Sequence, residues 1–375
     1  LSPRTGASAD HHLSPRTGAS ADHHLSPRTG PPASAASGER LSPPTDAPPA
    51  PSRLRAGLAL LLLALGYAAL RLAMNHEYAG APWDRLLDFS AAKPFGLRVL
   101  VPLLAWPLHG LLRVPTAWVF GLFEALATAG LVLATAAALR PFMPRRWAAA
   151  LGAALVVLLP VPFLLQHRWP IFYPYDTPAM AFTAAGVALL VRGRWRAAAA
   201  LAVLAALNRE SAVLLPAAAV ALLVRVPSGA VPPDMSVRTL PLRQLFPRAL
   251  GLAAAVAAAR LGVGVALRDN PGAPLQLFVD DAPRLLVNLA WLEAPEHWLY
   301  LPGYLGLVPL VWLLLPGWMP APLRRLGWVA LAWLGALLWV ANIDEPRVYG
   351  EALVLLYLPA AVAVQRWLQP TRPAV

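Results

Sequence analysis

The sequence predicts an all-α integral membrane protein, and three observations lead to this: its apolar composition, the length of its apolar runs, and the charge of the loops between them. Of the 375 residues, 58% are hydrophobic and 13% are charged, and the mean hydropathy is +0.55. A soluble domain needs about a quarter of its residues charged to cover its surface. The apolar runs are about 15–22 residues long, which as a helix crosses a hydrocarbon core. The alternative is an unusually apolar soluble helical protein.

The net charge of +12 does not indicate a nucleic-acid partner. The basic residues are nearly all arginine and lie in short loops between apolar runs, whereas a nucleic-acid interface gathers them on one soluble face. The chain has no cysteine, so disulfides and cysteine metal sites are excluded.

Residues 1–53 are predicted to form a disordered cytoplasmic tail. The dodecapeptide LSPRTGASADHH at 1–12 recurs at 13–24, and Pro, Ser, Ala and Gly dominate. Such a segment has too little apolar surface to offset the entropy of ordering. The pairs His11–His12 and His23–His24 are possible metal ligands, but nothing there would hold a fixed geometry. A polytopic domain over 54–367 and a short cytoplasmic tail over 368–375 complete the predicted organisation.

The first apolar run, Leu54–Met74, follows Arg53, which favours a cytoplasmic N-terminus and makes this run an uncleaved anchor. The next run, Leu97–Leu112, is broken by two prolines. Later runs are Ala117–Leu139, Trp147–Leu165, Pro178–Val191, Ala197–Leu207, Ser211–Val224, Ala249–Leu267, Tyr300–Leu315, Trp328–Asn342 and Ala352–Arg366.

The arginine-rich loops indicate which apolar runs cross the membrane. They are Arg140–Arg146, Arg192–Arg196, Arg225–Arg248, Pro316–Leu326 and the C-terminal tail. The positive-inside rule places all five in the cytoplasm. All five loops lie on the cytoplasmic side only if Leu97–Leu112 does not cross the membrane and instead lies on or dips into the outer face as an interfacial or re-entrant helix. The prolines of this run favour such a helix. We therefore predict about ten transmembrane helices, or about eleven if that run spans, with both termini in the cytoplasm.

The outer loops are then acidic and aromatic, and the first of them, Asn75–Arg98, is the longest polar interruption near the start of the membrane domain. It holds Asp84 and Asp88, which as part of a helix would share one face. Two interpretations remain: a functional outer face, or acidic residues that collect on whichever outer loops are long.

The 197–224 stretch must cross the membrane and return, yet its 28 residues make about 42 Å of helix against about 60 Å for two crossings. We expect two short helices meeting at Leu207–Ser211. Arg209 beside Glu210 is either a structural pair or a phosphate ligand oriented by its neighbour. Glu124 and Arg260, also within apolar runs, are further candidates.

Tyr173–Pro178 (YPYDTP) lies where an outer loop enters a span. Asp176 is a possible site residue, and it is equally suited to begin a helix, with proline in the first turn. Both roles are compatible.

Four motifs carry a resemblance: RVLVPLLA at 98–105, YDTPAMAF at 175–182, LNRESAVLLP at 207–216 and DEPRVYGE at 344–351. The chain resembles, over about Leu54–Trp367, a family of bacterial polytopic proteins associated with cell-surface glycopolymer formation. Their architecture is similar to the GT-C glycosyltransferases, which use polyprenyl-phosphate-linked sugars. The resemblance implies a bacterial cytoplasmic membrane location and a base at Asp84 or Asp88. The paired adjacent acids of the mannosyltransferases are absent, which leaves the base and any divalent metal open.

Transfer from a lipid-phosphate sugar needs a carboxylate that accepts a proton, a cation that holds the phosphate, and a groove for the lipid. We expect catalysis by Asp84 or Asp88. The expected substrate and phosphate ligands are Arg98, Tyr175, Asp176, Asn208, Arg209, Glu210 and Arg347. The partners are then the bilayer, the lipid-linked donor and a glycan acceptor. The alternatives are a transporter or flippase of a lipid-linked or anionic glycan precursor, and a non-catalytic scaffold of an envelope polymer assembly.

Overall fold

Helices account for 75% of the structure, a computed structural model that describes residues 53–159, 163, 170–225, 239–279 and 281–369. Within these ranges the only sheet is a short hairpin of β1 (Phe278–Val279) and β2 (Ala282–Pro283). The predictions for residues 1–52, including the histidine pairs, and for 370–375 lie outside the described residues.

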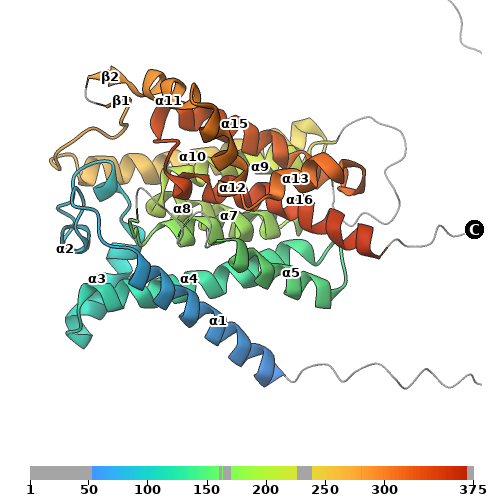
Figure 1. Cartoon of the computed structure of the whole chain (residues 1–375), viewed down its shortest axis with the longest axis horizontal. Coiled ribbons are helices and arrows are strands. Elements are labelled where there is room, and N and C mark those ends of the chain that lie inside the picture. The colour runs from blue at the N-terminus through green and yellow to red at the C-terminus, as the bar shows by residue number, and fades with distance from the viewer. Residues whose placement is uncertain (1–52, 160–162, 164–169, 226–238, 280, 370–375) are drawn as a thin grey trace, which may run out of the picture. The chain divides into compact units, whose positions relative to one another are not determined.

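The helices follow the predicted apolar runs (Figure 1). They are α1 (Arg53–Met74), α2 (Trp83–Leu87), α3 (Leu100–Leu112), α4 (Thr116–Leu139), α5 (Arg145–Leu158), α7 (Asp176–Val191), α8 (Trp195–Asn208), α9 (Leu214–Leu223), α10 (Leu242–Ala266), α11 (Arg284–Leu292), α12 (Tyr300–Tyr304), α13 (Val308–Leu314), α14 (Ala321–Arg324), α15 (Leu326–Val340) and α16 (Gly350–Leu368). Short 3₁₀ helices separate some of them: η1 (Phe95–Leu97), η2 (Glu210–Val213), η3 (Pro295–Leu299), η4 (Pro316–Trp318) and η5 (Pro346–Tyr349). Part of the 147–165 run lies outside the described residues.

Five helical segments of the described chain are long and apolar enough to cross a membrane. They are Leu54–Met74, Thr116–Leu139, Leu242–Ala266, Ala321–Val340 and Pro346–Leu368. A sixth is possible if Pro295–Tyr304 and Val308–Leu314, which meet at a 90° bend, form one broken span. The expected ten spans are therefore not reached by length and composition, because helices such as α7 and α8 have 16 and 14 residues. At about 1.5 Å per residue these are shorter than a hydrocarbon core of about 30 Å.

Helix α3 has 13 residues, with Pro107 inside it. One of its faces is buried, and the other exposes Leu104, Trp106 and Leu111. A short helix with an exposed apolar face is typical of a membrane interface.

The 197–224 stretch forms the expected broken pair. Helix α8 ends at Asn208, Arg209 has an extended backbone (φ −160°, ψ 153°), and η2 begins at Glu210 before α9 continues. The sequence prediction of two short helices meeting at 207–211 is confirmed.

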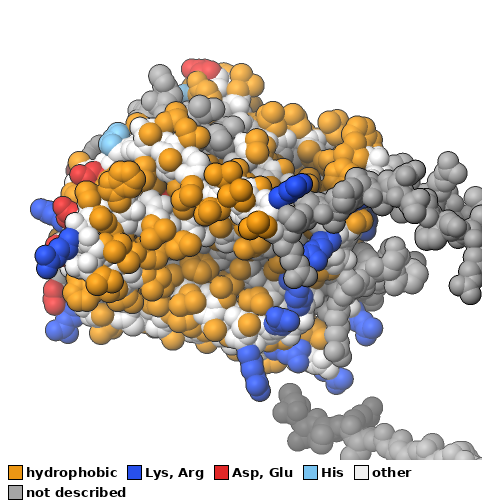
Figure 2. Space-filling view, turned by 90° about the horizontal axis from the view of Figure 1, so that it is seen from below, with side chains coloured by type: hydrophobic (Ala, Val, Ile, Leu, Met, Phe, Trp, Pro, Cys, Tyr) orange, Lys and Arg blue, Asp and Glu red, His pale blue; other side chains and the backbone are white. Residues whose placement is uncertain are grey.

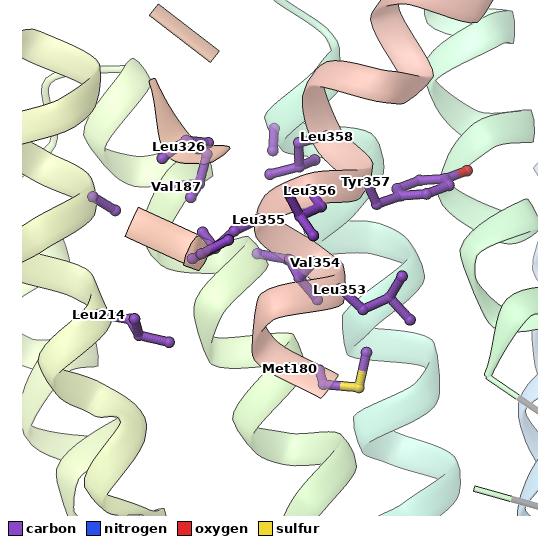
Figure 3. Packing of buried hydrophobic residues seen from close by; sticks show 14 of the residues in the cluster. Met180, Val187, Leu214, Leu326, Leu353, Val354, Leu355, Leu356, Tyr357 and Leu358 are labelled. Carbon is purple, nitrogen blue, oxygen red and sulfur yellow. The ribbon is translucent and has the colours of Figure 1, made fainter. Parts of the chain in front are cut away.

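Helix α16 is the centre of the helical assembly. In the most apolar 18-residue window of α16, 94% is buried inside the structure. The corresponding share is 22% for α1 and 17% for α10, which lie at the periphery. It packs against α7, α13 and α15. Figure 3 shows Leu353, Leu355 and Leu358 on different sides of this helix, surrounded by side chains of its neighbours, among them Met180 and Leu326. A helix that is apolar all round is typical of such a central position or of a membrane span.

The arginine-rich loops lie together. Arg140, Arg192 and Arg248, from three of these loops, line one pocket. Arg325 donates a hydrogen bond to the carbonyl that follows α9, and Arg366 donates one to η4, in the loop that carries Arg325. We call this the arginine end. In Figure 2 many basic side chains gather toward the right side of the view, where no acidic side chain is visible.

The acidic loops also lie together, at what we call the carboxylate end. His76 in the first loop pairs with Ile171 in the next. The Lys93 ammonium donates to a carbonyl just beyond α10, and Arg284 donates to Asn342. The Lys93 N–H also donates to Pro271, and the Ile343 N–H donates to Asn288. Thus the described residues of the four predicted outer loops contact one another; these loops are Asn75–Gly96, Gln166–Thr177, Asp269–Trp298 and Ile343–Glu351.

Candidate functional site

Arg71, in the last turn of α1, is fully buried and lies within a network of charged side chains. Its Nη1 lies 2.7 Å from Oε1 of Glu124, and its Nη2 lies 3.2 Å from Oδ2 of Asp176. The guanidinium carbon is 4.6 Å from the ring centre of Phe163 and 4.9 Å from that of Phe172. A buried charge requires such partners, because its desolvation otherwise costs several kcal/mol, in the range of about 3–5 kcal/mol when one partner is removed.

Asp176 connects the Arg71 guanidinium to the guanidinium of Arg209. Its other oxygen, Oδ1, lies 3.1 Å from Nη1 of Arg209, which is also 3.4 Å from Oε1 of Glu351. Ser211 donates its hydroxyl to the same Glu351 oxygen at 2.5 Å. The network therefore joins α1, α4, α7, the break between α8 and α9, and α16.

A cavity of about 160 Å³ lies beside this network at the carboxylate end. Its charged lining residues are Arg98, Arg209, Arg284, Arg347, Glu210 and Glu345. Four guanidiniums and two carboxylates give the lining a net charge of +2. Two of the guanidiniums, those of Arg98 and Arg347, each keep a buried nitrogen without a hydrogen-bond partner among the described residues. The cavity therefore favours an anionic ligand.

Glu210 pairs with Arg98, and this corrects the expectation that it orients its neighbour Arg209. Nη2 of Arg98 lies 2.6 Å from Oε1 of Glu210, and Nε lies 3.3 Å from Oε2. Arg209 pairs with Asp176 and Glu351 instead. Burial alone would lower the pKa of Arg98, but the adjacent Glu210 carboxylate raises it above its ordinary value.

Aromatic rings form the floor beneath two of the arginines. The guanidinium carbon of Arg347 lies 3.9 Å from the ring centre of Tyr173, and that of Arg98 lies 4.5 Å from the ring centre of Tyr175. Tyr173 in turn stacks on Phe95, with ring centres 5.5 Å apart. Burial raises the pKa of Tyr173, so its phenol stays neutral. Arg347 also forms an ion pair with Glu345.

An open apolar groove of about 570 Å³ runs between α9 and α15. Its lining is apolar side chains except for Arg325 at the arginine end. Trp333 lines both this groove and the charged cavity. The charged cavity and the open apolar groove therefore share one wall.

The two predicted catalytic carboxylates lie in a different recess. Asp84 and Asp88 line an exposed pocket of about 700 Å³, which shares no residue with the charged cavity. Asp84 accepts a hydrogen bond from the Thr116 hydroxyl at 2.7 Å. Asp88 accepts two from Ser90, one from its backbone N–H and one from its hydroxyl. Their shared face agrees with the expected spacing, but the structure does not bring them to the predicted phosphate ligands.

The other predicted site residues meet at the cavity or directly behind it. Arg98, Arg209, Glu210 and Arg347 line the cavity. Asp176, Tyr175 and Asn208 lie behind the wall and are buried, and Asn208 donates its amide to the Tyr175 carbonyl at 2.9 Å.

Sequence reasoning missed Arg71, Arg284 and Glu345 as parts of this arrangement. Arg71 was detectable, because an arginine inside the first apolar run needs a partner and Glu124 lies in the next long one. Arg260, the other charge noted within a run, donates to two backbone carbonyls instead of a carboxylate.

Comparison with known proteins adds no relative: no family model, curated protein or solved structure matches the chain. Among the described residues, no three His, Asp or Glu side chains are grouped as a metal site requires.

Proposed function

We propose that this chain is a membrane glycosyltransferase that moves a sugar from a polyprenyl-phosphate-linked donor to a cell-envelope glycan or lipid acceptor on the outer face. One observation carries the proposal. A cavity lined by four arginines and two glutamates shares the Trp333 wall with an apolar groove between α9 and α15. A ligand with an anionic head and a long apolar tail matches this combination.

The guanidiniums supply the electrostatic part of the reaction. Arg98 holds Glu210 through Nε and Nη2, which leaves Nη1 without a partner in the described structure. A phosphate beside Arg98 and Arg347 would use these unpartnered nitrogens and the net charge of the lining.

In the proposed step the acceptor hydroxyl oxygen attacks the anomeric carbon of the donor, and the bond from that carbon to the phosphate oxygen breaks. The leaving phosphate takes the bonding electron pair and is held by arginine. The acceptor proton passes to a carboxylate. We assign this role to Glu210, because it lines the cavity and its side chain is 37% exposed, against 12% for Glu345.

The test is sugar transfer in proteoliposomes from a panel of polyprenyl-phosphate sugars. We expect transfer by the wild type and a loss of about 100-fold or more in Glu210→Gln. Asp84→Asn and Asp88→Asn should retain activity if Glu210 is the base, and the reverse pattern would return the role to that pair. Arg85→Gln is the matched control, because Arg85 is an exposed arginine of α2 that lines neither site.

A second candidate, a transporter or flippase of such a precursor, is favoured by the buried network. Its carboxylates, Glu124, Asp176 and Glu351, outnumber its guanidiniums, Arg71 and Arg209. Glu124 and Glu351 each have one buried oxygen without a hydrogen-bond partner in the described part. A coupling cation would balance that charge.

One experiment distinguishes sugar transfer from transport. Net movement of an intact lipid-linked sugar across the bilayer, without release of the lipid phosphate, would support transport and reject transfer.

A further inference from the structure

A second pocket, of about 650 Å³, lies at the arginine end and plays no part in the proposed reaction. It is enclosed by the end of α4, the turn between α7 and α8, the end of α9 and the start of α10. Its polar and charged side chains are those of Arg140, Arg192, Trp195, Gln244 and Arg248. Among the described residues, no carboxylate lines it.

Its arginines are held by groups that leave their charge uncompensated. Arg192 donates from Nη1 to the Ala188 carbonyl at 2.8 Å and from Nη2 to the Ala137 carbonyl at 2.6 Å. Arg248 lies over the ring of Trp195, with its guanidinium carbon 5.6 Å from the ring centre. Within the described ranges none of the three lining arginines forms an ion pair with Asp or Glu, so the pocket stays cationic.

The arginines also repel one another. Partial burial, and then the neighbouring charges of Arg140 and Arg194, lower the pKa of Arg192. A bound anion would relieve both effects.

Leu242, Phe246 and Leu250 are each more than half exposed and lie on the side of α10 opposite Gln244 and Arg248. The side of α10 that carries Gln244 and Arg248 and lines the pocket is exposed as well, and Gly251 continues this side by one turn. Because α10 is also one of the candidate spans, this side faces lipid in a membrane. An anion that arrives along α10 is therefore one attached to a lipid.

We propose that this pocket binds the phosphate headgroup of an anionic phospholipid in the leaflet at the arginine end. The lipid's acyl chains lie along the exposed face of α10, and its phosphate lies between Arg140, Arg192 and Arg248. The inference is independent of the proposed sugar transfer, because the two pockets share no residue.

The experiment uses the full chain in nanodiscs and measures the retention of phosphatidylglycerol against phosphatidylcholine by native mass spectrometry. We expect preferential retention of phosphatidylglycerol, and a roughly fivefold loss for each of Arg140→Gln and Arg248→Gln, from about 1 kcal/mol per basic residue near an anionic surface. Within the described residues, neither of these two exposed arginine side chains forms a hydrogen bond to another helix, so their variants are expected to fold. Arg192→Gln additionally removes its bonds to α4 and α7.

Arg146→Gln is the matched control, since Arg146 is an exposed arginine at the same end outside the pocket. Equal losses in the control and the lining variants would show a diffuse surface charge and overturn the proposal. Equal retention of the two lipids would do the same. Displacement of phosphatidylglycerol by millimolar inorganic phosphate would identify a site for free phosphate and would reject the lipid headgroup.

Discussion

Replacing Asp176 with asparagine tests whether one carboxylate holds the buried network together. Asp176 is 1% exposed and contacts a different guanidinium with each oxygen, Arg71 at 3.2 Å and Arg209 at 3.1 Å. Asparagine keeps the shape and removes the charge. Since removing one partner of a buried ion pair costs about 3–5 kcal/mol, we expect Asp176→Asn to lower the free energy of unfolding by this amount.

The measurement is equilibrium unfolding in mixed micelles, followed by helical circular dichroism. Asp84→Asn is the control, because Asp84 is exposed and its loss should cost less than about 1 kcal/mol. The substitution also has an effect of the opposite sign on the free energy of unfolding. It leaves two carboxylates, those of Glu124 and Glu351, beside two guanidiniums, so that repulsion among the carboxylates is reduced. If repulsion among carboxylates dominated the network, Asp176→Asn would be as stable as the wild type or more so, and the reasoning from paired charges would be refuted.

Three further predictions test individual contacts. Tyr175→Phe should leave the free energy of unfolding unchanged within about 0.5 kcal/mol, since the buried Tyr175 hydroxyl has no hydrogen-bond partner among the described residues; a clear loss of stability in chemical denaturation would contradict this. Gly272→Ala should cost about 1–3 kcal/mol in the same assay, because Gly272 has φ +89° and an added Cβ would lie 2.7 Å from the Lys93 carbonyl oxygen; unchanged stability would exclude this strain. Trp333→Ala should weaken binding of a polyprenyl-phosphate sugar about tenfold or more and weaken binding of its tail-free headgroup less, measured by calorimetry, because the headgroup meets only the cavity side of Trp333 and the long ligand meets the groove side as well; equal losses for both ligands would reject the continuity of groove and cavity.

The positions of the helices were predictable from the sequence, because apolar runs and charged loops act locally along the chain. The break at 207–211 followed from length alone. The partners of the charged residues were not predictable, since the ion pairs of the network join residues far apart in the sequence, such as Arg71 with Asp176 and Arg98 with Glu210. Adjacency suggested the wrong partner for Glu210, because Arg209 pairs with Asp176 and Glu351 and leaves Glu210 to Arg98.

Asp84 and Asp88 illustrate the same limit. Their spacing correctly indicated a shared face, and both line one recess. Whether that recess meets the arginines depends on how α2 packs beside α3 and α4, and the sequence carries no local signal for this packing.

The central position of α16 has a consequence for biosynthesis. Asp176 and Arg209 connect Arg71 of α1, the first described helix, with Glu351 of α16, the last. Until α16 leaves the ribosome, Arg209 lacks one of its two carboxylate partners, and the apolar surfaces that α16 covers remain open to lipid. A chain truncated before residue 350 would therefore leave Arg209 with Asp176 as its one carboxylate partner in the network and would expose the apolar surfaces that α16 covers, a feature that separates unfinished chains from complete ones.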